Sequence, residues 1–151
     1  MPQVEQSIEI SAPPDAVFAL IADQPERMPE WWTLFEQQER VTPPPTAVGS
    51  VSRYVFNLMG IRIKGEHQVL QIDPAKHLVI KTLSGIDGMF DFTLAGTDDG
   101  GTRLTVRAAY ALPGSVLGQR INRLTIEQKN ERDLQEGLLS LKALIEGERS
   151  P

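Results

Sequence analysis

Hydrophobic and polar residues alternate with a period of two over six stretches of the chain. The stretches are 4–10, 51–58, 61–72, 77–83, 89–94 and 102–112. This period places every second side chain on one face of an extended backbone, so each stretch predicts a strand with one buried face. The connection Asp98-Asp99-Gly100-Gly101 is typical of a hairpin turn, which favours antiparallel pairing of the last two strands.

The phase of the alternation changes inside the third stretch. Ile61 and Ile63 share one phase, whereas Leu70 and Ile72 share the opposite one. One extra residue in a strand reverses the faces of all residues after it, so the change predicts a β-bulge. We expect the bulge near Gly65, within one long bent strand.

Helical spacing replaces the alternation in three places. A short helix is expected from about Pro14, and another short helical segment over Pro25–Trp32. A long helix, or two abutting ones, is expected from an N-cap at Ser115 to about Glu148. The apolar stripe of this long segment consists of Leu117, Ile121, Leu124, Leu134, Leu138, Leu141 and Ile145. Three polar residues, Gln128, Glu131 and Gln135, interrupt the stripe on a helical wheel.

This order of elements is typical of the α+β class. We expect one antiparallel sheet of about seven strands, two short helices after the first strand, and a long C-terminal helix. A sheet of that size curls, and the long helix must bury its stripe on the concave face. The sequence shows no repeat and no second domain, so residues 1–151 are expected to form one domain.

The composition removes several classes of chemistry. The chain has no cysteine and only two histidines, so thiolate nucleophiles, Cys-type zinc sites and iron–sulfur clusters are excluded. We expect no metal and no organic cofactor. The net charge of -5, without a basic stripe, argues against a nucleic-acid partner.

The localisation is predicted from apolar runs. The longest run, residues 16–22, has seven residues, far below the length of about 20 that a membrane span requires. The first residues lack the basic start and apolar stretch of a signal peptide. We therefore expect a soluble cytoplasmic protein without a membrane span, as a monomer or weak homodimer.

Short motifs along nearly the whole chain carry a family resemblance. They are IEISAPPDAVF at 8–18, PEWW at 29–32, VGSV at 48–51, VLQIDP at 69–74 and GGTRLT at 100–105. In this order, followed by a long helix, the chain resembles the START-related SRPBCC superfamily, in its polyketide cyclase/dehydrase branch, over about residues 3–147. The resemblance implies a helix-grip fold with a deep, mostly apolar internal cavity. Members include lipid carriers, aromatase/cyclases, hormone receptors and chaperone regulators, so the ligand stays open.

Aromatic residues are the first candidates for a ligand site. In the resembling family the segment holding Trp31 and Trp32 borders the cavity mouth, where an indole can gate the cavity or stack on a ligand. The alternative is one tryptophan in the core and one on the surface. Tyr54 and Tyr110 lie on the apolar phase of their strands, where a phenol can donate to a ligand carbonyl or polarise it in a cyclase. The alternative is a core tyrosine bonded to backbone or water.

Polar candidates complete the site. We expect His67 to face solvent from its strand, and the alternative is an internal base that shuttles a proton near neutral pH. His77 is expected to be exposed. Glu131 in the interrupted stripe either faces a wet cavity, pairs with a cation or lies exposed. The expected ligand-lining set is Trp31, Trp32, Tyr54, Phe56, Phe90, Phe92, Tyr110, Leu124, Gln128 and Glu131.

Three functions follow from these residues. The first is binding or carriage of a small apolar, lipid- or polyketide-like ligand in an internal cavity, driven by burial of apolar surface. The second is a cofactor-independent cyclase or dehydratase with acid–base groups drawn from Tyr54, His67 and Tyr110. The third is a protein-interaction accessory domain that uses the acidic residues of 1–50. We favour binding over catalysis because no nucleophile, base and orienting group combine into a catalytic set.

Overall fold

A seven-stranded antiparallel sheet forms the body of the protein in the computed structural model, which describes residues 3–58, 60–111 and 123–149. The strands are β1 (Gln3–Ile10), β2 (Phe35–Arg40), β3 (Val51–Leu58), β4 (Ile61–Asp73), β5 (His77–Thr82), β6 (Asp87–Gly96) and β7 (Thr102–Ala111). Their order in the sheet is β1-β7-β6-β5-β4-β3-β2. Sequential strands are therefore neighbours from β2 to β7, and β1 closes the other edge by pairing with β7.

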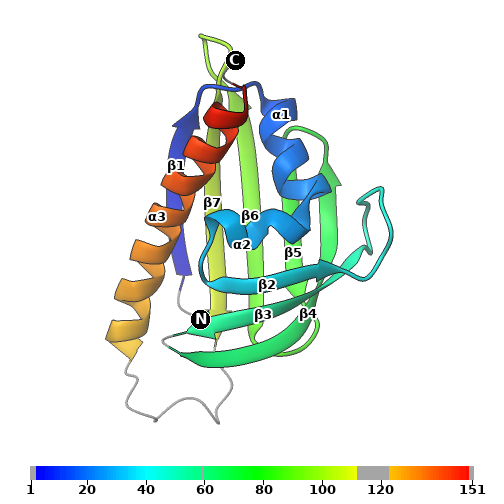
Figure 1. Ribbon diagram of the computed structural model, residues 1–151, viewed down its shortest axis with the longest axis vertical. Helices are drawn as coiled ribbons and strands as arrows, with labels where there is room; N and C mark the ends of the chain where they lie inside the picture. Colours follow the sequence, from blue (N-terminus) through cyan, green and yellow to red (C-terminus); the bar gives the residue numbers. More distant parts are fainter. Residues whose placement is uncertain (1–2, 59, 112–122, 150–151) are drawn as a thin grey trace.

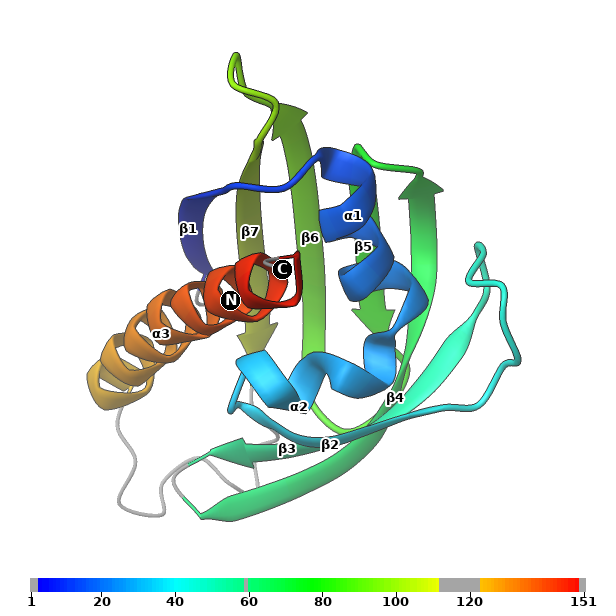
Figure 2. The ribbon, with the colours of Figure 1, turned by 45° about the horizontal axis from the view of Figure 1, so that its top comes forward.

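The helices all lie on one side of the curled sheet (Figures 1 and 2). The α-helix α1 (Pro14–Phe18) continues into the π-helical turn η1 (Ala19–Asp23). The 3₁₀ turn η2 (Pro25–Arg27) leads into α2 (Met28–Trp31), and the C-terminal helix is α3 (Arg123–Arg149). A proline at the start of α1, η2 and α2 suits the first helical turn, where a backbone N–H has no partner to lose. These elements confirm the α+β helix-grip fold expected from the sequence.

The last helix buries its apolar stripe against β1 and α2. Leu134, Leu138, Leu141 and Ile145 repeat every three or four residues and are all buried. Burial of side chains of this size contributes roughly 2 kcal/mol each relative to exposure. The C-terminal part of α3 is also held by ion pairing, because the Glu148 carboxylate lies 2.8 Å from an Arg27 guanidinium nitrogen.

One local prediction needs a correction. The pairing of β3 with β4 runs without interruption past Gly65, so the bulge expected at that residue is absent there. The register shifts instead between Val69 and Gln71 in the pairing of β4 with β5, which makes Leu70 the extra residue. Leu70 is consequently exposed while Ile72 returns to the inner face.

Two further expectations have mixed outcomes. The strand β2 follows the tryptophans and supplies the seventh strand of the expected sheet, in a segment that is not among the six alternating stretches. The expected N-cap Ser115 and the first stripe residues Leu117 and Ile121 lie outside the described residues. No helix among the described residues is long and apolar enough to cross a membrane.

Candidate functional site

Both tryptophans are buried in a packed aromatic cluster on the inner face of the sheet. The Trp31 and Trp32 rings stack with centroids 5.7 Å apart, and Trp32 meets Phe35 and Phe90 edge to face at 5.2 and 5.7 Å. Trp31 is 2% exposed and Trp32 1%. The alternative with one tryptophan on the surface is therefore wrong, and the stacking fixes α2 against the sheet.

Around these rings little free volume is left among the described residues. The volume left free between the packed side chains is about 0 Å³ where the following residues meet: Met28, Trp32, Phe35, His67, Ile80, Phe90 and Phe92. A neighbouring space beside η1 and the start of β3 has about 20 Å³, enough for one water molecule. The deep cavity implied by the resemblance is thus absent from this part of the interior, where aromatic side chains take its place.

The Tyr54 hydroxyl is fully engaged by backbone groups. It donates to the Ser84 carbonyl at 2.7 Å and accepts from the Ile86 N–H at 3.0 Å. The opposite residue on β4 is Gly65, and a Cβ there would lie 2.6 Å from the Tyr54 hydroxyl oxygen. Tyr54 therefore fastens the β5–β6 connection to β3, and its phenol is held in a structural role.

His67 is buried, so its expected solvent-facing position is wrong. Its Nε2 lies 2.9 Å from Gln38 Oε1, and Gln38 Nε2 donates to the Pro25 carbonyl at 2.7 Å. Because the amide of Gln38 uses its N–H₂ on Pro25, Nε2 of His67 must carry the proton, and Nδ1 is left buried without a partner. Burial lowers the pKa of His67 to about 4, which keeps the ring neutral at physiological pH.

His77 is half-buried rather than exposed. Its Nε2 lies 2.9 Å from an Asp91 carboxylate oxygen and its Nδ1 lies 3.0 Å from Gln71 Nε2. The pair stands on the outer face of the sheet, because Asp91 alternates with the buried residues Phe90 and Phe92. This histidine is therefore remote from the inner face and takes no part in a site there.

Tyr110 differs from Tyr54 because its hydroxyl has no partner. The ring is packed on Phe56 and Phe90, with centroids 5.4 and 6.2 Å away, and the residue is 3% exposed. Its hydroxyl oxygen is buried and makes no hydrogen bond. Burial raises the pKa of Tyr110, and the negative charge of Asp133 on α3 raises it further. The phenol is thus a protonated donor that faces the helix.

The polar residues that α3 turns inward are not those expected. Gln128 and Glu131 are exposed, whereas Asn130 and Asp133 are buried. Asn130 Oδ1 has no hydrogen-bond partner, and the Asp133 carboxylate pairs with Lys129 Nζ at 3.2 Å. The side chain of the other candidate on this helix, Leu124, lies outside the described residues.

The phase of the stripe explains the error. Counting back from Leu134, a step of three residues leads to Glu131 and a step of four leads to Asn130, so the spacing alone admits both residues. The step of four is correct, because the buried part of the helix fixes the phase. Asn130 was therefore detectable in the sequence as a candidate.

Trp32 joins these residues at the same helix face. A Cβ on Gly137 would lie 3.5 Å from Trp32 Cδ1, the ring atom bonded to Nε1, so the indole edge lies against α3. Trp32 Nε1 is buried without a partner. Asn130, Asp133 and Gly137 follow one another at intervals of three and four residues, which places them on one face of α3.

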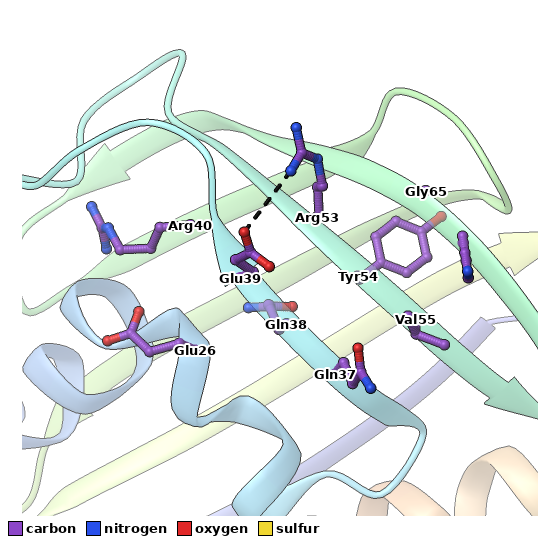
Figure 3. A pocket seen from close by; sticks show the side chains of 10 residues that line it. Glu26, Gln37, Gln38, Glu39, Arg40, Arg53, Tyr54, Val55 and Gly65 are labelled. Atoms are coloured by element: carbon purple, nitrogen blue, oxygen red, sulfur yellow. Dashed lines mark ion pairs between the residues drawn. The ribbon is translucent and has the colours of Figure 1, made fainter.

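A second hollow opens on the surface where β2, β3, β4 and η2 meet (Figure 3). It measures about 690 Å³ and is lined by Glu26, Gln37, Gln38, Glu39, Arg40, Arg53, Tyr54, Val55, Lys64 and Gly65. Glu39 and Arg53 face each other across it at 3.9 Å. Five of its lining side chains are charged, in contrast to the apolar enclosure typical of small-molecule sites.

The acidic N-terminal region is largely matched by arginines of the same chain. Glu5 pairs with Arg107 at 3.1 Å, and Glu36 pairs with Arg62 at 2.7 Å. Arg107 and Arg62 stand on the outer side of the sheet, as expected from the alternation. Internal pairing leaves less unbalanced charge for an outside partner, so the structure adds no support for an accessory domain that binds through this region.

The sequence matches one protein family over most of its length. The family described as "Polyketide cyclase / dehydrase and lipid transport" matches residues 1–146. No curated protein sequence matches the chain significantly.

Solved structures share the fold at low sequence identity. Protein TTHA0849 from Thermus thermophilus is 19% identical with a TM-score of 0.81, over 99% of this chain and 100% of that one. A START superfamily protein from Mycobacterium smegmatis is 12% identical with a TM-score of 0.77, over 96% and 97%. The Zhui aromatase/cyclase from Streptomyces sp. R1128 is 15% identical with a TM-score of 0.70, over 97% and 92%. At these identities the likeness establishes the fold alone.

Proposed function

This chain belongs to the polyketide cyclase / dehydrase and lipid transport family, and we propose that it binds a small, mostly apolar molecule between α3 and the concave face of the sheet. The observation that carries the proposal is the Tyr110 hydroxyl, which is buried on that face and has no hydrogen-bond partner. Buried polar atoms in native proteins nearly always have a partner, and an unpaired one costs about 1–3 kcal/mol. A ligand oxygen beside Tyr110 recovers this energy.

Apolar side chains pack against the ring that carries the unpaired hydroxyl. Phe56 and Phe90 pack against the Tyr110 ring, and Leu134 is fully buried on the helix side. Apolar ligand surface removed from water at such walls contributes about 25 cal/mol per Å² before the costs of association. Affinity then comes from apolar burial, and orientation from the polar atoms.

The ligand is placed on the α3 side of the aromatic cluster. The rings of Trp31, Trp32 and Phe35 already fill the other side, where about 0 Å³ is free. The charge of Asp133 on α3 raises the pKa of the unpaired Tyr110 hydroxyl, and the unpaired Asn130 Oδ1 belongs to the same helix. Both observations support a ligand site between the aromatic cluster and α3.

Native mass spectrometry tests the proposal. We expect the purified protein, or the protein incubated with a total lipid extract, to carry an added mass that organic solvent releases as a small molecule. Tyr110→Trp, which adds bulk on the inner face of β7, should abolish the added mass. Arg103→Trp adds the same bulk on the exposed outer face of that strand and should leave it unchanged. A wild-type protein that takes up nothing, or equal uptake by both variants, rejects the proposed site.

A cofactor-independent cyclase or dehydratase is the second candidate. Of the three acid–base candidates, Tyr54 is held by two backbone bonds, whereas His67 Nδ1 and the Tyr110 hydroxyl have no partner. Of these two unpaired groups, Tyr110 alone carries a proton to donate, because the proton of His67 lies on Nε2. The raised pKa of Tyr110 suits a donor that polarises a carbonyl and does not suit a base. Cyclisation of a poly-β-ketone that is lost in Tyr110→Phe would favour this candidate, and turnover no faster than in buffer would reject it.

A further inference from the structure

We propose that the loop between β2 and β3, residues 41–50, is a docking surface for a zwitterionic lipid bilayer. This β2–β3 loop extends beyond the sheet on the side of the molecule away from α3 (Figures 1 and 2). The inference goes beyond the proposed ligand site, because it depends on other residues on another part of the surface.

Apolar side chains are exposed along the β2–β3 loop. Val48 is 65% exposed, more than any other large hydrophobic residue that the structure describes, and Val41 is 41% exposed. The other exposed apolar residues of the loop are Pro43, Pro44, Pro45 and Ala47. Leu70, also exposed, is adjacent, because the residue before it exchanges two backbone hydrogen bonds with residues 49–50. Neighbouring exposed apolar residues of this kind mark contacts with membranes or proteins.

The charges around the loop fit zwitterionic lipid. The sequence has no Asp, Glu, Lys or Arg from residue 41 to residue 52, and Arg40 and Arg53 stand at the two ends of this segment. An arginine at the edge of an inserted apolar segment is suited to lipid phosphates. Glu39 lies 3.9 Å from Arg53 and balances part of this positive charge, and the whole chain has a net charge of -5. An anionic surface is therefore the poorer match.

The backbone of the loop favours lipid over a protein partner or water alone. Lipid chains offer no hydrogen-bond acceptors, so an inserted N–H needs a partner within its own chain. Five residues of the loop donate their N–H to an oxygen of this protein, namely Val41, Thr42, Ala47, Gly49 and Ser50. The three prolines have no N–H to satisfy. Eight of the ten residues thus bring no free backbone donor into an apolar medium.

The two threonines of the loop turn their hydroxyls to the protein. Thr46 donates to the Ala22 carbonyl of η1 at 2.7 Å, and Thr42 accepts from the Val51 N–H at 3.0 Å. These bonds hold the loop in one shape while its valines and prolines stay exposed. A loop that is already ordered loses little conformational entropy on docking.

Neutral phosphatidylcholine vesicles test the docking surface. We expect the wild-type protein to sediment reversibly with sucrose-loaded vesicles, with half of it bound at about 1 mM lipid. Vesicles that also contain phosphatidylserine should bind no more protein. Raising the NaCl concentration from about 0.1 to about 0.5 M should not release the protein, because screening does not weaken an apolar contact.

Two matched substitutions assign the binding to the loop. Val48→Asp places a charge at the most exposed apolar position and should weaken vesicle binding at least tenfold. Leu139→Asp makes the same kind of change on α3, where the leucine is 56% exposed, and should leave vesicle binding unchanged. Far-ultraviolet circular dichroism confirms that both variants are folded.

The lack of cysteine permits a direct measurement of insertion. Val48→Cys and Leu139→Cys are each labelled with a nitrobenzoxadiazole fluorophore, whose emission rises and shifts to the blue in apolar surroundings. Neutral vesicles should produce this change for the label at residue 48 and not for the label at residue 139.

Three results would overturn the proposal: a wild type that does not bind neutral vesicles, an equal loss of binding in Val48→Asp and Leu139→Asp, or labels that respond alike. Dimerisation in analytical ultracentrifugation that Val48→Asp abolishes, without vesicle binding, would assign the loop to a second copy of the chain instead. Ligand uptake is measured separately by mass spectrometry, so the failure of either proposal leaves the other standing.

Discussion

Removing one oxygen atom from each of the two tyrosines should have opposite consequences for stability. Tyr54 and Tyr110 are both buried on the inner face of the sheet, and both lose only the phenolic hydroxyl on mutation to phenylalanine. The difference lies in the partners of the two hydroxyls. Tyr54 has two backbone partners and Tyr110 has none.

The expected magnitudes follow from these partners. Tyr54→Phe leaves the Ser84 carbonyl and the Ile86 N–H buried without the hydroxyl that bound them at 2.7 and 3.0 Å. At about 1–2 kcal/mol for each group, the free energy of unfolding should fall by about 2–4 kcal/mol. Tyr110→Phe breaks no bond and removes an unpaired polar atom, so it should change stability by less than about 1 kcal/mol and in the stabilising direction.

Urea denaturation followed by tryptophan fluorescence measures both changes, because Trp31 and Trp32 are buried and report global unfolding. The slope of the unfolding free energy against urea should be the same for both variants, so that the midpoints compare directly. A loss of about 2 kcal/mol or more in Tyr110→Phe would show that its hydroxyl has a structural partner. That result would remove the observation on which the proposed ligand site depends.

Three further predictions concern stability. Because the pKa of His67 is lowered to about 4, the folded state binds a proton less readily than the unfolded chain. The contribution of the neutral ring to stability is present above about pH 6.5, and the free energy of unfolding should fall by about 2 kcal/mol from pH 7 to pH 5. His67→Gln should abolish this fall in urea titrations. Gly65→Ala should cost about 3 kcal/mol, because a Cβ there would overlap with the Ser84 carbonyl oxygen, whereas the Cβ of Gly96→Ala meets no atom within 4 Å and should cost nothing. Gly147→Ala should raise the melting temperature through helix propensity, and Gly137→Ala should not, because its Cβ would lie 3.0 Å from a tryptophan carbonyl oxygen.

Each of these predictions has a result that contradicts it. An unchanged pH dependence in His67→Gln would show that His67 is not the group whose protonation lowers stability between pH 7 and pH 5. Equal stability of Gly65→Ala and Gly96→Ala would mean that the β5–β6 connection moves away from the added methyl group without lowering the free energy of unfolding. An equal gain from Gly137→Ala and Gly147→Ala would mean that the contact between α2 and α3 is loose.

Most of the architecture was predictable because one face of every element is buried. Alternation along the strands and the stripe of α3 both report burial directly, so the sheet, the order of helices and the inward phase of Tyr54 and Tyr110 follow from the sequence. The bulge was misplaced by about five residues because a phase change fixes only the interval between Ile63 and Ile72. Pairing with β5 decides which residue is the extra one, and pairing is not a local property.

The site was less predictable because it depends on what lies opposite each residue. Tyr54 shares an inward phase with Phe56, and His67 points inward because the register shifts only after it, yet the sequence does not tell which polar atoms find partners. Gln38, which holds His67, and the carbonyl of Ser84, which holds Tyr54, are far away along the chain. The alternatives between a catalytic, a ligand-binding and a structural side chain are decided by such long-range contacts.

The position of Gly137 connects the packed end of the interior with the proposed ligand end. With no side chain there, the backbone of α3 comes close to the Trp31 carbonyl, so α2 and α3 lock together over the filled aromatic cluster. Asn130 and Asp133 lie on the same helix face beyond that contact, where the inward side chains turn from apolar to polar. We therefore expect a ligand to bind beside Asn130 and Asp133, and not at the Gly137 contact where α2 and α3 are packed. Mutations that loosen the Gly137 contact should therefore lower stability more than they lower ligand uptake, whereas mutations of Asn130 should do the reverse.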